Sequence, residues 1–163
     1  MNNLFEKKVE FPTFFQDAYG LSNAKEIATL YYGYALLIIA GADGEVNQAE
    51  MNWLINHQRA LNIPEYILEA YRTFDYKNGN LEELLPNINK ANVPFNVGRA
   101  LIYHAIKMSK ADFEFADQEQ KAVRKAAKLL GVSDDILLAL NGLVDVEESV
   151  NRTRKALIET RKI

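Results

Sequence analysis

A carboxylate-rich turn occurs twice in this sequence, and its side chains are the ones best suited to chemistry. The first copy, residues 42–50, reads ADGEVNQAE, and the second, residues 111–119, reads ADFEFADQE. An offset of 69 residues relates Asp43 to Asp112. Hard divalent cations such as Ca²⁺ and Mg²⁺ prefer carboxylate and amide oxygens as ligands. The repeated turn therefore predicts a cation site.

The predicted ligands are the oxygen-bearing side chains of the two turns. Glu50 also has a purely structural explanation, because it stands three residues after Asn47, the spacing of a capping box. Asp43 follows the end of a helix, where the dipole is negative and a carboxylate is unfavourable without compensation. A bound cation would offset this unfavourable interaction. Alternatively, the Asp43 side chain could accept backbone N–H bonds in an Asx turn. The complete predicted set is Asp43, Glu45, Asn47, Glu50, Asp112, Glu114 and Glu119.

The turns do not form an EF-hand loop. Gly44 is at the second position rather than the sixth, and Leu54 stands at the twelfth, where an EF-hand has a carboxylate. The expected ion is Ca²⁺, with Mg²⁺, Mn²⁺ and Zn²⁺ as alternatives. A turn that binds no metal is a further alternative. The second turn has Phe113 in place of the glycine and Ala116 in place of Asn47. If one turn binds, we expect it to be the first.

The composition limits the remaining classes of function. The chain has 163 residues, of which 48% are apolar, and it has no cysteine. This predicts one folded domain and excludes disulfides, thiolate catalysis and iron–sulfur clusters. The net charge is −3, and the dipole of a C-terminal helix accounts for the only basic cluster, so nucleic-acid binding is not expected. That cluster consists of Arg152, Arg154, Lys155, Arg161 and Lys162.

No apolar run has the length of a membrane span. The longest such run, residues 30–40, has about 11 residues, against the roughly 18 that a span needs. Residues 1–10 carry charges and no apolar core, so no secretory signal is predicted. A cytoplasmic location without membrane insertion is the expectation.

Helix signals dominate the sequence and predict an all-α domain of about seven or eight helices. Within residues 23–144, apolar residues at helical spacing on both sides of each acidic turn predict two helical hairpins, joined by a connection with a short helix at residues 81–88. An aromatic N-terminal segment and a C-terminal helix should pack on this core, completing a single domain of residues 1–163, and no strand is expected. Helix starts are predicted at capping-box spacings and two further signals: Asn23/Glu26, Asn47/Glu50, Asn80/Glu83, Asp145/Glu148, Asn92–Pro94 and Ser133.

These motifs resemble the tellurite-resistance TerB family. The similar segments are AGADGEV at residues 40–46 with Glu50, LNIP at residues 61–64, and the second turn with LGV at residues 130–132; the resemblance covers residues 23–144. It implies a TerB-like bundle in a bacterial protein tied to tellurite resistance or chemical stress. It also implies metal binding by the matching acidic residues, which are Asp43, Glu45, Glu50, Asp112, Glu114 and Glu119. TerB-like domains also look like modules attached to other proteins, so the resemblance implies protein partners.

The sequence does not predict an enzyme. It has no phosphate-binding loop, nucleophile elbow or zinc-protease motif. His57 and His104 are expected to be ordinary core or interface residues. The leading hypothesis is a metal-binding stress-response protein. The alternative is a protein–protein interaction module, co-chaperone-like or a membrane-complex adaptor, without metal; a two-metal hydrolase ranks third, and a homodimer is left open.

Overall fold

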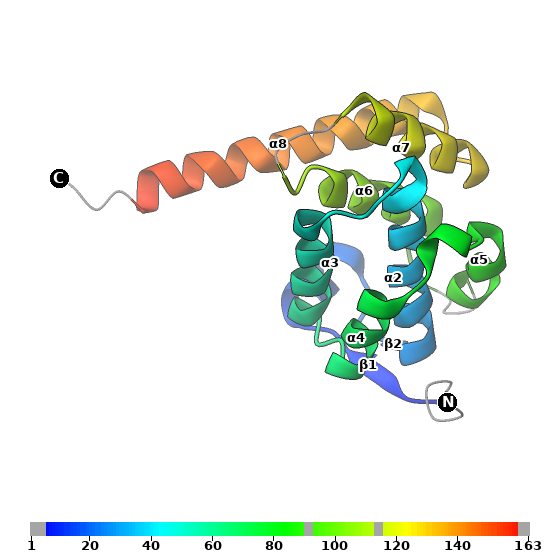
Figure 1. Cartoon of the computed structure of the whole chain (residues 1–163). Coiled ribbons are helices and arrows are strands. Elements are labelled where there is room, and N and C mark those ends of the chain that lie inside the picture. The colour runs from blue at the N-terminus through cyan, green and yellow to red at the C-terminus, as the bar shows by residue number, and fades with distance from the viewer. Residues whose placement is uncertain (1–5, 90–92, 113–115, 160–163) are drawn as a thin grey trace.

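The computed structural model describes residues 6–89, 93–112 and 116–159. Within these residues the chain forms eight α-helices, two short strands and two 3₁₀ turns, so the predicted helical class and helix number are confirmed. The elements are arranged around one central helix, α2 (Figure 1). In chain order they are β1 (Lys8–Glu10), α1 (Thr13–Tyr19), β2 (Asn23–Lys25), α2 (Glu26–Ala40), η1 (Gly41–Asp43), α3 (Gln48–Ala60), α4 (Glu65–Thr73), η2 (Tyr76–Asn78), α5 (Leu81–Asn89), α6 (Val97–Ser109), α7 (Asp117–Leu129) and α8 (Asp134–Ile158).

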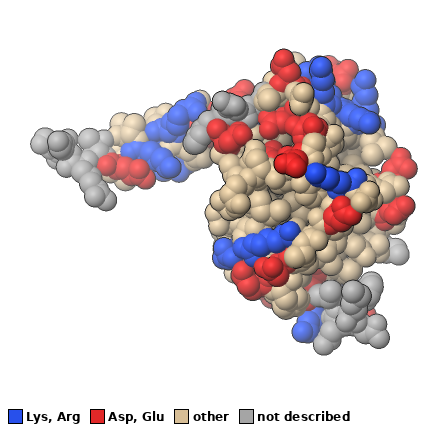
Figure 2. Space-filling view, in the orientation of Figure 1, with Lys and Arg blue, Asp and Glu red and all other residues tan. Residues whose placement is uncertain are grey.

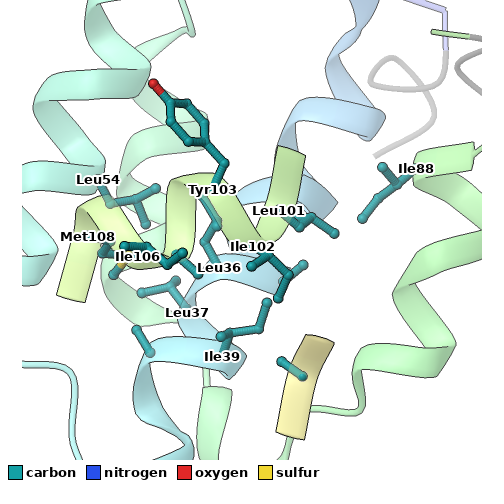
Figure 3. Packing of buried hydrophobic residues seen from close by; sticks show 14 of the residues in the cluster. Leu36, Leu37, Ile39, Leu54, Ile88, Leu101, Ile102, Tyr103, Ile106 and Met108 are labelled. Carbon is teal, nitrogen blue, oxygen red and sulfur yellow. The ribbon is translucent and has the colours of Figure 1, made fainter. Parts of the chain in front are cut away.

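Helix α2 is the centre of the hydrophobic core. Its residues Leu36 and Leu37 are fully buried, and the helix contacts α4, α5, α6 and α7. Figure 3 shows its side chains among those of α6, with Leu54 of α3 and Ile88 of α5 at the sides. Complete burial of each leucine contributes about 1.5–3 kcal/mol, so this helix anchors the others. The apolar run that is too short for a membrane is thus a core helix.

The two hairpins have matching boundaries. Helices α3 and α7 have the same length, and α7 begins and ends 69 residues after α3. The residues that follow them also correspond, because Asn62 (φ 66°) and Gly131 (φ 69°) both adopt the left-handed conformation that terminates a helix. In each case the N–H of the following residue donates to a carbonyl in the last turn of the helix. Ile63 N–H donates to Gln58 O, and Val132 N–H donates to Ala127 O. The helix ends therefore keep the offset of the acidic turns.

Two predicted helix starts are wrong. Asn23 does not cap a helix, because it lies in β2 and is paired with Glu10 of β1 in an antiparallel register. The same pairing corrects the expectation that the chain has no strands. Asp145 and Glu148 lie inside α8, which continues without a break through the second predicted start. Their spacing of three residues is also that of neighbours on one helix face, so it does not by itself identify a helix start.

The remaining helix starts agree with the sequence signals or lie close to them. Asn47 and Glu50 form a complete capping box, and the Asn80 side chain accepts a hydrogen bond from the Glu82 N–H. Ser133 caps α8. Asn92 lies outside the described residues, and α6 is capped instead by Asn96, which accepts from the Arg99 N–H at 2.9 Å. For these helices the sequence signals therefore lie within a few residues of the observed caps.

The N-terminal aromatic segment packs on the core. The rings of Phe11 and Phe15 have centroids 4.6 Å apart, and Phe15 stacks on Tyr19 at the same distance. Phe14 is the exception, because its side chain is 59% exposed. The two strands hold this segment beside the start of α2.

Helix α8 packs on the domain through its first half only. Leu137 and Val144 are buried, and the helix contacts α6, but every residue from 149 to 159 is exposed. The second half extends away from the rest of the structure (Figure 1). Among the described residues, no helix combines the length and apolarity required to cross a membrane.

Gly33 should be a position where one methyl group destabilises the fold. A Cβ atom there would lie 2.2 Å from the Tyr71 ring, which is fully buried. We expect Gly33→Ala to lower the free energy of unfolding by about 1–3 kcal/mol through overpacking. Gly142→Ala in α8 is the matched control, because its Cβ would meet no atom within 4 Å. In the control, the free energy of unfolding should be unchanged or rise by up to about 1 kcal/mol. Urea unfolding measures both, and equal effects would contradict the packing argument.

Candidate functional site

The first acidic turn is a rigid connection between α2 and α3. The 3₁₀ turn η1 prolongs α2, and Gly44 then reverses the chain with φ 145° and ψ −68°, a conformation that requires glycine. The Tyr76 ring packs directly on Gly41, where a Cβ atom would lie 2.4 Å from the ring. The Tyr76 hydroxyl also accepts a hydrogen bond from the Val46 N–H at 3.1 Å. The turn is therefore held from outside as well as by its own backbone.

Glu50 closes the first turn and is almost completely buried. Its carboxylate accepts from the Asn47 N–H at 2.8 Å, and the Asn47 side chain accepts from the Glu50 N–H at 2.9 Å. Only 1% of Glu50 is exposed. The predicted capping role of this residue is thus confirmed, and it places a carboxylate inside the protein.

The second turn repeats half of this arrangement. The Glu119 carboxylate accepts from the Ala116 N–H at 2.8 Å, and Glu119 is also buried. Ala116 has no side-chain oxygen to return the bond, as the sequence comparison of the two turns anticipated. Phe113 and Glu114 lie outside the described residues.

The two acidic turns meet in space. The Asn47 side-chain amide of the first turn donates to the Asp112 carboxylate of the second at 3.2 Å, and α7 contacts η1. Burial raises the pKa of Glu50 to about 7, with a hydrogen bond from the Asn47 N–H acting against it and the charges of Glu119, Asp43 and Asp112 adding to it. Figure 2 shows acidic side chains gathered where α7 and the end of α2 come together. The turns therefore form one negatively charged region.

Two lysines border this region, and each forms an ion pair, one with a carboxylate of the first turn and one with a carboxylate of α8. Lys77 lies 3.4 Å from Glu45, and Lys110 pairs with Asp145 of α8. Asp43 is exposed and makes no hydrogen bond or ion pair with another described residue, so the Asx turn considered as its alternative role is not formed. Asp43 is therefore an exposed carboxylate of the first turn that is not engaged with another described residue.

The donor chemistry of the two turns suits a hard cation, but the donors do not converge on one point. Among residues 6–89, 93–112 and 116–159, no three carboxylates or histidines lie close enough together to hold a metal ion. Asp43, Glu45 and Asp112 are exposed, whereas Glu50 and Glu119 are buried and engaged as caps. The metal site predicted from the sequence, including Glu114, therefore stays a prediction.

A cluster of histidines and tyrosines is the polar feature that sequence reasoning missed. His104 is buried on α6, with its Nε2 3.1 Å from the Tyr19 hydroxyl and its Nδ1 2.6 Å from the Tyr32 hydroxyl. A neutral imidazole has one donor and one acceptor nitrogen, so one hydroxyl donates and the other accepts. The ring of His57 lies 4.9 Å from that of His104 and stacks on Trp53 at 4.7 Å.

This cluster favours neutral histidines. Burial lowers the pKa of His57 to about 4, aided by Lys107 and opposed by a hydrogen bond to Gln58. Burial, with His57 and Lys107, also lowers the pKa of His104. The rings border an apolar hollow of about 70 Å³ lined mainly by aliphatic and aromatic side chains. His104 is a core residue and His57 is partly buried beside it. No local signal could show that four separate helices bring these histidines and the two tyrosines together.

The helical bundle, with two hairpins whose acidic turns meet, defines the class of fold as TerB-like. A solved structure with this fold is that of a tellurite resistance protein from Nostoc punctiforme PCC 73102. The two structures superpose with a TM-score of 0.80, over 91% of this chain and 92% of that chain, at 22% sequence identity. The resemblance inferred from the turns is thus confirmed at the level of fold. No protein-family model matches the chain, and no curated protein matches it.

Glu50→Gln should stabilise the cation-free protein at alkaline pH. Glutamine can still accept the Asn47 N–H bond but carries no charge. Because the folded pKa of about 7 exceeds the ordinary 4.5, the native carboxyl contributes stability below pH 4.5 and loses it as the pH rises through 7. In chelator, the variant should gain about 3 kcal/mol relative to the native protein between pH 4.5 and 8. Denaturant unfolding at both pH values measures this gain.

The control for that experiment is Glu83→Gln, which removes an exposed carboxylate near another helix start. Its pH profile should follow that of the native protein. Parallel profiles for Glu50→Gln and the native protein would contradict the burial of a strained carboxylate at the first turn.

His57→Phe should make the protein less sensitive to acid. The phenyl ring can keep the stacking on Trp53 but cannot bind a proton. Because the folded pKa of about 4 lies below the ordinary 6.5, the neutral histidine contributes stability above pH 6.5 and loses it as the pH falls toward 4. Between pH 7 and 4.5 the variant should therefore lose less unfolding free energy than the native protein. Equal losses in urea unfolding would show that His57 is protonated freely in the folded state.

Proposed function

We propose that this chain is a non-enzymatic stress-response protein of the tellurite-resistance type that binds a divalent cation at its paired acidic turns. The observation that carries the proposal is the hydrogen bond from Asn47 to Asp112, which joins the two turns. The structurally similar protein is described as a tellurite resistance protein, and we propose the same role for this chain.

Electrostatics supports cation binding at this place. Burial raises the pKa of Glu50, and the charges of Glu119, Asp43 and Asp112 raise it further, so each of these three carboxylates repels Glu50. The bordering lysines are paired with Glu45 and Asp145. A divalent cation would relieve this repulsion, with Asp43 and Asp112 as the accessible ligands and with water or backbone carbonyls completing the shell.

The surface position of the turns supports a non-catalytic role. Catalytic sites are usually concave and exclude water from the reacting groups. Asp43 and Asp112 are exposed, and the apolar hollow in the domain is lined by aromatic and aliphatic side chains around His57 and His104. A sensing or ion-stabilised structural role agrees better with this arrangement than hydrolysis does.

The second candidate is an interaction module that uses the same acidic face without metal. It is favoured by the exposure of Asp43, Glu45 and Asp112 on one region of the surface. A basic partner bound there should be released by high salt, because exposed charge pairs are screened over about 8–10 Å at physiological ionic strength. Pull-down of partners at low and high salt tests this candidate. A partner retained at high salt would count against it.

Isothermal titration calorimetry of chelator-stripped protein tests the cation proposal. We expect saturable binding of Ca²⁺, or failing that of Mg²⁺, Mn²⁺ or Zn²⁺. Binding should be lost in Asp43→Asn and kept in the control Asp17→Asn, which removes an exposed carboxylate on α1. At a hundredfold excess over the dissociation constant the unfolding free energy should rise by about 2.7 kcal/mol. Absence of binding by all four ions would reject the proposal in favour of the interaction module.

A further inference from the structure

The second half of α8 presents an apolar surface that the described parts of this chain do not cover. All residues from 149 to 159 are exposed, among them Val150 at 53%, Leu157 at 77% and Ile158 at 74%. In Figure 1 this part of the helix extends beyond the rest of the domain. A helix of about three turns without tertiary contacts is marginal in water. Its apolar side chains therefore indicate a partner.

Four exposed apolar residues, together with Thr153, follow the period of a coiled coil. Leu143, Val146, Val150, Thr153 and Leu157 are spaced alternately by three and four residues, the a/d spacing of a heptad. Val146, Val150, Thr153 and Leu157 line a shallow apolar groove on the helix. We call these five residues the outer stripe.

The outer stripe is distinct from the face by which α8 binds its own domain. Leu137 and Val144 are buried against that domain, whereas Leu143 is 45% exposed and Val146 is 61% exposed. At 100° per residue, Val146 lies about 160° around the helix from Val144. A second helix can therefore pack on the outer stripe without displacing the first contact.

The charges of α8 select the orientation of a second copy. Asp145, Glu147 and Glu148 precede Val150, whereas Arg152, Arg154 and Lys155 follow it. Two copies in parallel would align like charges, which is unfavourable across an interface. An antiparallel pair would place the acidic segment of each helix beside the basic segment of the other. The same surface on both subunits then makes a closed two-fold interface.

We propose that α8 pairs with α8 of a second copy to form an antiparallel homodimer through the outer stripe. In the register that the a/d spacing favours, Val146 faces the partner's Leu157, and Val150 faces the partner's Thr153. Arg154 then lies beside the partner's Glu147, because both residues flank the stripe on the same side. This pairing uses none of the carboxylates of the acidic turns, so it is independent of the proposed cation binding.

Glu147 is already ordered for such a contact. Its carboxylate accepts from the Tyr103 hydroxyl at 2.6 Å and from Lys107 Nζ at 3.2 Å, so its position is fixed by its own subunit. An ordered side chain loses less conformational entropy when a charged partner approaches. Arg154 donates to Asn151 at 2.9 Å on the exposed helix.

Cysteine cross-linking tests the proposed orientation, because the chain has no cysteine of its own. We expect a mixture of Val146→Cys and Leu157→Cys to oxidise to a mixed disulfide dimer. Each variant alone should remain uncrosslinked, since identical positions would be about 16 Å apart along the axis of an antiparallel pair. Leu138→Cys, which is 74% exposed on another face of α8, is the control and should not cross-link. Cross-linking of each single variant with itself would indicate a parallel pair and overturn the proposal.

Sedimentation equilibrium of the full chain tests the association itself. The native protein should form dimers, Val150→Glu should be monomeric, and the control Leu138→Glu should remain dimeric. Circular dichroism checks that both variants stay folded, as expected for substitutions at exposed positions. A native protein that stays monomeric would overturn the proposal and would indicate that another molecule covers the stripe in the cell. A Val150→Glu variant that still dimerises would also overturn it.

Discussion

The burial of α2 on nearly all sides is the constraint from which the rest of the structure follows. A helix with Leu36 and Leu37 fully buried must be surrounded, and α4, α5, α6 and α7 supply the surrounding surfaces. Because α2 continues directly into η1, its position also fixes the start of the first acidic turn. The second hairpin packs on the same helix and brings Asp112 to Asn47. Hydrophobic burial thus places like charges together that would otherwise separate.

The acidic region consequently combines rigid and adaptable parts. The rigid part consists of Glu50 and Glu119, which are buried and hold the first turns of α3 and α7. The adaptable part consists of exposed carboxylates such as Asp43, which can change rotamer without disturbing a helix. Donors of suitable chemistry therefore lie in one region, although no three of the described donors converge. Binding of a cation would require movement of side chains and not of helices.

The features predicted correctly are those determined by neighbouring residues. The Asn47/Glu50 box, the Ser133 cap and the ends of the two hairpins depend on contacts within a few positions, so the spacing of residues was sufficient. The helix start predicted at Asn23 is wrong because the backbone of Asn23 pairs with Glu10. This tertiary contact overrides the capping pattern. The approach of His57 to His104, and of one turn to the other, depends on how separate helices pack. Such contacts leave no local pattern from which they could be predicted.

The stacking of Trp53 on His57 gives this protein an internal optical reporter. Trp53 is the only tryptophan of the chain, and the two rings lie 4.7 Å apart at an interplanar angle of 13°. Because the two rings are stacked, a change in the charge of His57 should change the surroundings of the indole and, with them, its emission. The tryptophan also stands less than one helical turn from Glu50 on α3. We therefore expect the emission of this single residue to report changes at the histidine cluster and at the first acidic turn without any added label.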